Sequence, residues 1–166
     1  MKKGLLLLLL LLLTLSVLLT GCGEESKNDV NPETSKQETM HCESSIRDVV
    51  NGYETTSKFT IYYTGDYVDK VETVETVISE SEDFLDNMEE YINSTYDAMN
   101  SAYGGYSYEV IREDGSIVSN VVIEYSKMDL EQYITDQPTM SNYVENDKFL
   151  VDGIVEMYES FGATCE

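Results

Sequence analysis

The chain has 166 residues, of which 32 are acidic and 10 are basic, so its formal net charge is −22, and 42% of its residues are hydrophobic. A chain this acidic cannot neutralise a phosphate backbone, which excludes nucleic acid as a direct partner. One His and three Cys leave too few ligands for a four-residue His/Cys zinc site once one Cys has another role.

The first 21 residues have the pattern of a secretory signal peptide. Lys2 and Lys3 precede a run of Leu over residues 5–13 and a further apolar stretch to Leu19. The tetrapeptide Leu19-Thr20-Gly21-Cys22 then resembles the bacterial lipobox, in which the Cys thiol receives a diacylglyceryl group before cleavage. We therefore expect a lipoprotein signal peptide at 1–21 and a lipid anchor on Cys22, which would hold the mature chain on the extracytoplasmic face of the cell membrane.

Two alternatives to this anchor stay open. About 17 apolar residues lie near the lower limit for a membrane-spanning helix, so the leader could remain uncleaved. Conventional cleavage that leaves an unmodified Cys22 is the other alternative.

A polar segment follows the anchor. Residues 23–39 read GEESKNDVNPETSKQET, and Val30 is the only clearly apolar side chain among them. Because such a segment buries too little surface to offset its ordering entropy, we expect a flexible lipidated tether at 22–39. A solvated start to the domain is the alternative. The domain itself is expected at 40–166, where 27 acidic and six basic side chains lie.

The first part of the domain has the pattern of a β-hairpin. Residues 53–63 are rich in β-branched and aromatic side chains, Thr64-Gly65-Asp66 supplies a turn, and residues 67–78 continue as a strand. Val68, Val71, Val74 and Val77 lie three residues apart, which could also suit a helix. The density of β-branched residues and the preceding turn favour the hairpin.

A helix is predicted over residues 81–103. Acidic residues fill its first turn, apolar residues recur at spacings of three and four, and Gly104-Gly105 follows as a C-terminal cap. A second hairpin is predicted from 106–112 and 117–125, with Asp114-Gly115 as the turn signal.

Two shorter helices complete the predicted elements, at 129–134 and at about 151–161. The fold class predicted from these elements is α+β, an antiparallel sheet of two β-hairpins with helices packed on one face.

Cys42 and Cys165 lie near opposite ends of the predicted domain. In an exported protein such a pair suggests a disulfide, which the chain-entropy estimate values at about 4 to 5 kcal/mol for a loop of about a hundred residues. Two free thiols are the alternative. A redox enzyme is disfavoured because the chain has no C-x-x-C motif.

Several segments together resemble one bacterial family. They are the lipobox, the early Cys42, and the stretches FTIYYTGDYVDKVE, YGGY, VVIEYSKMDLEQY and GIVEMYESFGATCE. These segments look like the YehR-like lipoproteins, a group of unknown function also labelled DUF1307. The resemblance covers residues 40–166 and implies an extracytoplasmic lipoprotein with a compact α+β domain. It carries over the anchor Cys22 and no catalytic position.

We found no catalytic signature in the chain. His41 is the only imidazole, and its neighbour Cys42 would point to the opposite face of a strand. Carboxylates are abundant, but a calcium loop of the D-x-[DN]-x-[DN]-G type is absent. We therefore expect no catalytic residue, no metal site and no cofactor. Most of the 13 Tyr are expected to pack in or beside the core and not to form a binding platform.

The sequence thus predicts a non-enzymatic cell-surface lipoprotein that binds a ligand or a protein of the envelope. An envelope-acting enzyme with paired carboxylates and an accessory subunit of an envelope complex are the alternatives. The expected partners are the membrane, through the lipid anchor, and an unidentified protein or small ligand.

Overall fold

The computed structural model describes residues 36–166. The predicted signal peptide and the anchor Cys22 lie outside the described residues, as does most of the predicted tether. The strands of the large sheet are β1 (Gln37–Asp48), β2 (Tyr53–Thr64), β3 (Tyr67–Ser79), β4 (Tyr106–Glu113), β5 (Ser116–Glu124) and β8 (Thr164–Cys165). The helices are α2 (Glu82–Tyr103), α3 (Leu130–Asp136) and α4 (Val151–Ser160), and the 3₁₀ helices are η1 (Tyr125–Lys127) and η2 (Pro138–Tyr143).

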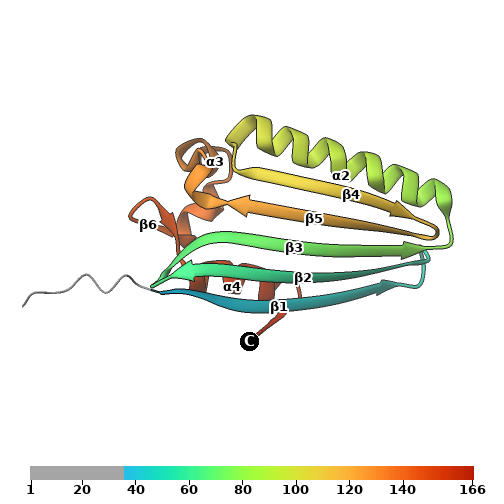
Figure 1. The fold of residues 1–166 in the computed structure, drawn as a ribbon, viewed down its shortest axis with the longest axis horizontal. Helices are drawn as coiled ribbons and strands as arrows, with labels where there is room; N and C mark the ends of the chain where they lie inside the picture. Colours follow the sequence, from blue (N-terminus) through green and yellow to red (C-terminus); the bar gives the residue numbers. More distant parts are fainter. Residues whose placement is uncertain (1–35) are drawn as a thin grey trace, which may run out of the picture. The chain divides into compact units, whose positions relative to one another are not determined.

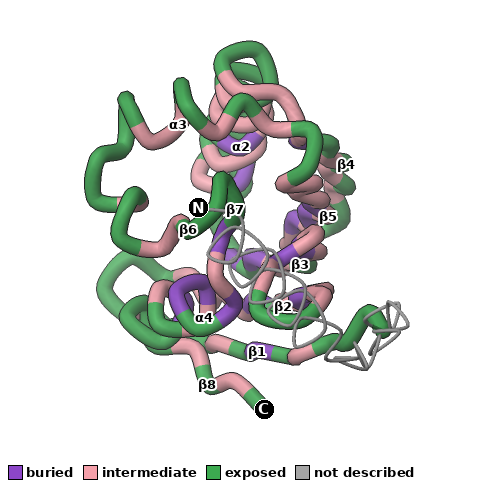
Figure 2. The backbone as a smooth tube through the Cα atoms, turned by 90° about the vertical axis from the view of Figure 1, so that its left-hand side faces the viewer, coloured by how far each residue is buried: buried purple, intermediate pink, exposed green. Residues whose placement is uncertain are grey.

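The predicted fold class is confirmed. All neighbouring strands of the six-stranded sheet are antiparallel, and their order is β4-β5-β3-β2-β1-β8 (Figure 1). Figure 2 shows α2, α3 and α4 on the same side of the sheet. No helix of residues 36–166 lies on the opposite face of the sheet, which we call the outer face.

The sheet is larger than the two predicted hairpins because two further strands extend it. β1 pairs with β2 along its whole length, from Gln37↔Thr64 to Asp48↔Tyr53. The short β8 then pairs with β1 at Cys42↔Cys165. The domain therefore begins before residue 40, since the last three residues assigned to the tether, Gln37 to Thr39, belong to β1.

A β-bulge explains the spacing of the valines in β3. Tyr62 pairs with Lys70 and Tyr63 pairs with Val68, so Asp69 is an extra residue. The bulge shifts the alternation by one, and Val68 and Val71 are both buried on the helix side. Val74, by contrast, is 42% exposed. The three-residue spacing thus arises from a bulged strand and not from a helix.

Local signals fix the ends of α2. The Ser81 hydroxyl accepts a hydrogen bond from the Phe84 N–H at 3.2 Å, which is an N-cap interaction. At the other end, Gly105 has φ +77°, and a Cβ there would come within 2.8 Å of the Glu124 carbonyl oxygen. A residue without a side chain is therefore required where α2 turns into β4.

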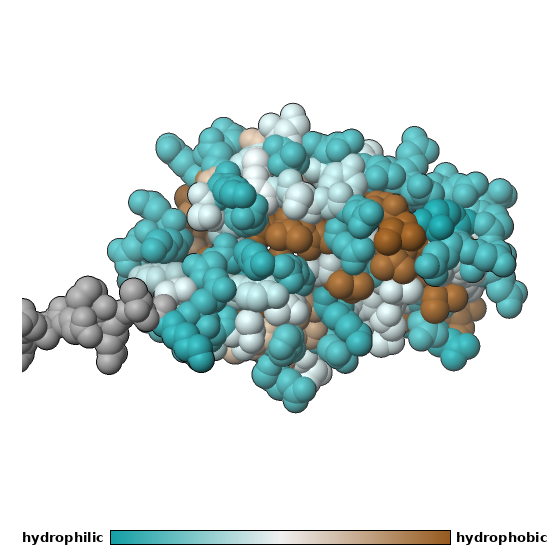
Figure 3. All heavy atoms as spheres, in the orientation of Figure 1, coloured by the Kyte–Doolittle hydropathy of each residue, from teal (hydrophilic) through white to brown (hydrophobic). Residues whose placement is uncertain are grey.

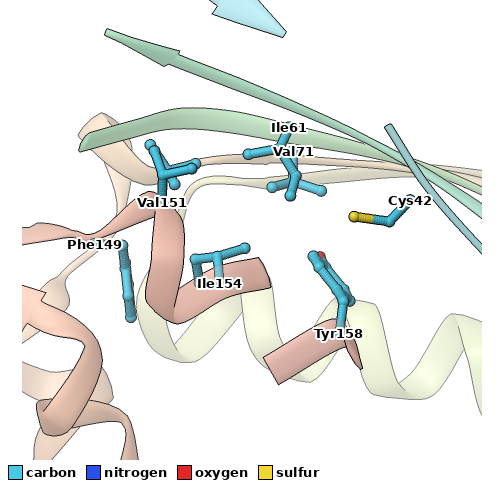
Figure 4. Packing of buried hydrophobic residues seen from close by; sticks show 8 residues of the cluster. Cys42, Ile61, Val71, Phe149, Val151, Ile154 and Tyr158 are labelled. Atoms are coloured by element: carbon cyan, nitrogen blue, oxygen red, sulfur yellow. The ribbon is translucent and has the colours of Figure 1, made fainter. Parts of the chain in front are cut away.

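Two apolar clusters lie between the sheet and the helices. One joins α4 to β1, β2 and β3, and Figure 4 shows Ile154 and Tyr158 of α4 directed at Ile61, Val71 and Cys42. The other joins α2 to β3 and β5 through Val77, Leu85, Ile92 and Ile117. The core therefore depends on helices that are distant from each other in sequence.

Candidate functional site

A pocket with an apolar floor lies beside a small second sheet. Strands β6 (Val144–Glu145) and β7 (Lys148–Phe149) form this sheet, and Asn146 and Asp147 make the turn between them. The cavity volume is about 480 Å³, which lies in the range of small-molecule sites. Its apolar lining is Val68, Tyr125, Met128, Leu130 and Phe149, and its polar lining is Asp69, Ser126, Asp147 and Lys148.

Aromatic stacking builds the floor of this pocket. Phe149 is 1% exposed, and its ring centroid lies 4.7 Å from that of Tyr125. The Tyr133 ring of α3 contacts Phe149 nearly edge-on, with centroids 6.0 Å apart. These contacts bring together η1, α3 and β7, three segments with no strong periodicity of their own. The sequence gives no local signal for the pocket because its walls meet only in the folded chain.

The bulge in β3 places Asp69 in the lining of the pocket. Its Oδ2 accepts hydrogen bonds from the Thr64 hydroxyl at 2.7 Å and from the Gln37 side-chain amide at 2.9 Å. Both donors are neutral, so the carboxylate is oriented without being neutralised. A bulge commonly re-aims a side chain in this way.

The β6–β7 turn places charges of both signs at the mouth of the pocket. Asn146 and Asp147 both have positive φ, 52° and 57°, as a two-residue hairpin turn requires. The Asn146 side-chain amide donates to the Tyr67 hydroxyl at 2.8 Å, and the Lys148 ammonium lies 5.3 Å from the centre of the Tyr67 ring. Lys148 is thereby held against an aromatic face, while Asp147 has no such partner among the contacts of the described chain.

The tyrosines near the pocket are neutral hydrogen-bonding groups at physiological pH. Burial raises the pKa of the Tyr125 phenol well above its usual range, and Tyr158 and Tyr106 add to the effect. Burial also raises the pKa of Tyr133. Because these phenols keep their protons, they offer donors and flat apolar faces, not charges.

A hollow of similar volume, about 490 Å³, lies at the other end of β3. It is formed where β1 turns into β2 and where β3 leads into α2, and its lining includes Arg47, Asp48, Glu54 and Glu80. Its one aromatic lining residue is Tyr53, and four of its eleven lining residues are charged. We therefore place the candidate binding site at the pocket beside β6 and β7.

The structure also locates the residues that were singled out in the sequence. Cys42 and Cys165 form a disulfide, and their Cα atoms are 4.0 Å apart. Cys42 is 1% exposed and faces α4, whereas His41 is exposed on the outer face, with its Nδ1 3.3 Å from the Thr60 hydroxyl. The two side chains point to opposite faces of β1, as the strand argument predicts.

Two observations bear on catalysis and metal binding. Hydrogen bonds from Asn51 lower the pKa of Asp48, and a hydrogen bond from Lys70 lowers the pKa of Glu72. A general acid needs a shift in the opposite direction. Within residues 36–166 no three His, Cys, Asp or Glu side chains are grouped so that they could hold a metal ion.

A carboxylate on the inner face went unnoticed in the sequence. Glu75 of β3 accepts a hydrogen bond from the Ser57 hydroxyl at 2.9 Å and pairs across the ladder with Ser119. Ser57 and Ser119 are both buried. This polar row lies on the helix side of the sheet, and no sequence signal distinguishes Glu75 from the other acidic residues of β3.

No helix in the described part of the chain is long and apolar enough to span a bilayer. No protein-family model matches the sequence, and no curated protein matches it. Among solved structures, the chain is similar to the NMR structure of a protein from Streptococcus pneumoniae TIGR4. The two are 11% identical, the match covers 81% of this chain and 87% of that chain, and the TM-score is 0.47.

Proposed function

We propose that the protein is a lipid-anchored, extracytoplasmic binding protein of the YehR-like kind, and that its pocket takes a small aromatic or aliphatic cation. The lipobox-like Leu19-Thr20-Gly21-Cys22 supports the anchor. The aromatic floor beside charged residues supports the binding role, and this pocket is the observation that carries the proposal.

The charges of the pocket favour a cationic ligand. Two carboxylates, those of Asp69 and Asp147, and one ammonium group, that of Lys148, line the pocket. Lys148 already lies against the Tyr67 ring. The half-buried Tyr125 ring in the lining adds the attraction that aromatic rings have for cations. An apolar body would thus pack on the floor while a positive group lies near the carboxylates.

The anchor predicts the behaviour of a Cys22→Ser variant. Cells that express the wild-type chain and are fed labelled palmitate should yield a labelled protein in the membrane fraction. The variant should carry no label and leave that fraction, because two or three acyl chains supply the membrane affinity. The matched control is the Cys42→Ala, Cys165→Ala double variant, which should keep the label. An unlabelled wild-type chain, or a label that survives in Cys22→Ser, would refute the anchor.

The pocket predicts binding of a simple probe, phenethylammonium. For a ligand of this size we expect a Kd on the order of 1 mM for the full chain in detergent micelles, measured by NMR titration. The neutral isostere 2-phenylethanol should bind several-fold more weakly. Asp147→Asn should reduce affinity for the cation several-fold while preserving the turn, because Asn also tolerates positive φ.

A blocking variant tests the location of the site. Ser126 is exposed and lines the pocket, so Ser126→Trp should fill the mouth and weaken phenethylammonium binding at least tenfold. Ser94→Trp, at an exposed position on α2, is the matched control and should leave binding unchanged. Equal binding of the alcohol and the cation would refute the proposed ligand class, and unchanged affinity in Ser126→Trp would refute the site.

A further inference from the structure

The two edges of the large sheet differ. At one edge, β8 pairs with β1 and is bonded to it through Cys42 and Cys165. At the other edge, β5 is the only strand of residues 36–166 that pairs with β4. An unpaired strand edge presents a row of backbone donors and acceptors that can bind another extended chain.

The ladder register shows which groups of β4 are free. The Glu124 N–H donates to the Gly105 carbonyl at 2.8 Å. Hydrogen-bonded and non-hydrogen-bonded residue pairs alternate in an antiparallel ladder. The backbone N–H and C=O groups of the odd-numbered residues of β4 therefore bond to β5, and those of the even-numbered residues point away from β5. Consistently, the Tyr106 N–H points away from β5 and donates to the Asn100 side chain at 3.3 Å. The N–H groups of Tyr108, Val110 and Arg112 have no backbone partner in the described chain.

Carboxylates flank this free edge on its helix side. The Arg112 guanidinium bonds to Glu82 and lies 3.7 Å from Asp86, and the Tyr108 hydroxyl donates to Asp97 at 2.7 Å. These contacts show which face of α2 overlooks β4. Glu90 lies one turn beyond Asp86 on that same face, and α2 contains no basic residue.

Carboxylates also flank the edge on the outer face. Glu109 and Glu113 are exposed there, and they alternate with side chains that pack toward α2. Figure 3, which views the outer face, shows hydrophilic residues along the margin formed by α2. Arg112 is the only basic side chain in β4, and it is already bonded to Glu82.

The negative charges beside β4 decide which kind of strand can pair with its free edge. Pairing of β4 with β4 of a second copy would bring Glu109 and Glu113 of both chains together, and each domain is strongly acidic. A strand with Lys or Arg side chains would meet carboxylates whichever way these side chains point. We propose that the free edge of β4 binds an extended, basic segment of a partner protein as an added strand.

The length of the edge sets the length of that segment. From Tyr106 to Arg112 the edge spans about 20 Å, at about 3.4 Å per residue, which corresponds to six or seven residues of the partner. This surface is separate from the pocket beside β6 and β7. If phenethylammonium failed to bind the pocket, the proposal that β4 binds an added strand would still stand.

The test uses a capped heptapeptide of alternating Lys and Val, with four Lys, and the full chain in detergent micelles. Hydrogen exchange measured by NMR should slow at least tenfold at the amides of Tyr108, Val110 and Arg112 when the peptide saturates the protein. The amides of Glu109 and Ile111 already bond to β5 and should not change. Unchanged hydrogen exchange at the amides of Tyr108, Val110 and Arg112 would overturn the proposal.

A second peptide separates strand addition from simple charge attraction. In it, two Pro separate successive Lys, so it carries the same charge but cannot form a ladder. It should bind at least tenfold more weakly at low salt, and equal binding would overturn the proposal. Pairing of two copies of the protein through β4, detected by light scattering without peptide, would also overturn it.

Two variants locate the bound strand. Val110→Pro removes an outward N–H while keeping the bonds to β5, and Pro is tolerated at such an edge position. It should weaken peptide binding at least tenfold. Glu109→Lys with Glu113→Lys changes only exposed side chains, so it retains the fold and should weaken binding in a salt-dependent manner. Unchanged affinity in both variants would refute the proposal.

Discussion

Removal of the Cys42–Cys165 disulfide is expected to lower the free energy of unfolding by about 4 to 5 kcal/mol. The bond joins residues 123 positions apart, and it restricts the unfolded chain more than a short loop would. It also holds β8 on β1, where only a few ladder bonds act, among them the two between His41 and Glu166 at 2.9 and 3.0 Å. Urea unfolding of the Cys42→Ala, Cys165→Ala double variant measures the loss.

The reduced wild-type chain is the control for this experiment. It keeps both Cys side chains, so it separates the covalent contribution from the packing of Cys42, which is 1% exposed. We expect the reduced wild type to lose most of what the double variant loses. A loss below about 1 kcal/mol in both proteins would show that the disulfide contributes little to stability.

Phe149→Ala is expected to reduce the free energy of unfolding by about 3 to 5 kcal/mol. Phe149 is 1% exposed and contacts Tyr125 and Tyr133. Its truncation leaves a void where β7, η1 and α3 meet, since neighbouring segments relax only partly. Urea unfolding of the oxidised full chain measures the change.

Phe161→Ala provides a matched control, because it removes the same side chain from a position that is 72% exposed. Its effect should stay within about 0.5 kcal/mol. Equal losses in the two variants would contradict the assignment of Phe149 to the core. Since Phe149 also forms the pocket floor, its variant should lose phenethylammonium binding as well, whereas Phe161→Ala should retain it.

The pocket and the β4 edge use different parts of the fold. The pocket depends on the segment after β5, in which short elements pack around Phe149. The edge depends on the long β4–β5 hairpin and on the acidic face of α2. Ser126→Trp alters only the pocket and Val110→Pro alters only the β4 edge. Binding at one surface can therefore be measured while the other is changed.

Most elements of the domain could be predicted because their signals are local. The turns at Thr64-Gly65-Asp66 and Asp114-Gly115 mark two hairpins, and β-branched residues fill their strands. Ser81 and Gly104-Gly105 mark the ends of α2. Each of these signals acts within a few residues, so it can be recognised in the sequence without the tertiary structure.

The features that were missed depend on contacts between distant segments. The extension of the sheet to Gln37 requires pairing with Thr64, and the position of β8 requires β1. The bulge at Asp69 follows from how β3 pairs with β2 at Tyr62 and Tyr63. The local sequence does not predict these pairings, because the register of a strand is set by its partner strand and by the side chains that both strands bury.

The amino-acid sequence by itself determined the α+β class and the strongly acidic charge of the domain, which follow from periodicity and composition. It suggested the pairing of Cys42 with Cys165, which the structure contains as a disulfide. The predicted anchor at Cys22 also comes from the sequence alone. Only the tertiary structure decided where the acidic residues gather and which strand edge stays unpaired. It also decided that Phe149, Tyr125 and Asp69 line one pocket. These features depend on long-range packing, because contacts with distant parts of the chain fix the positions of segments that have no local sequence pattern.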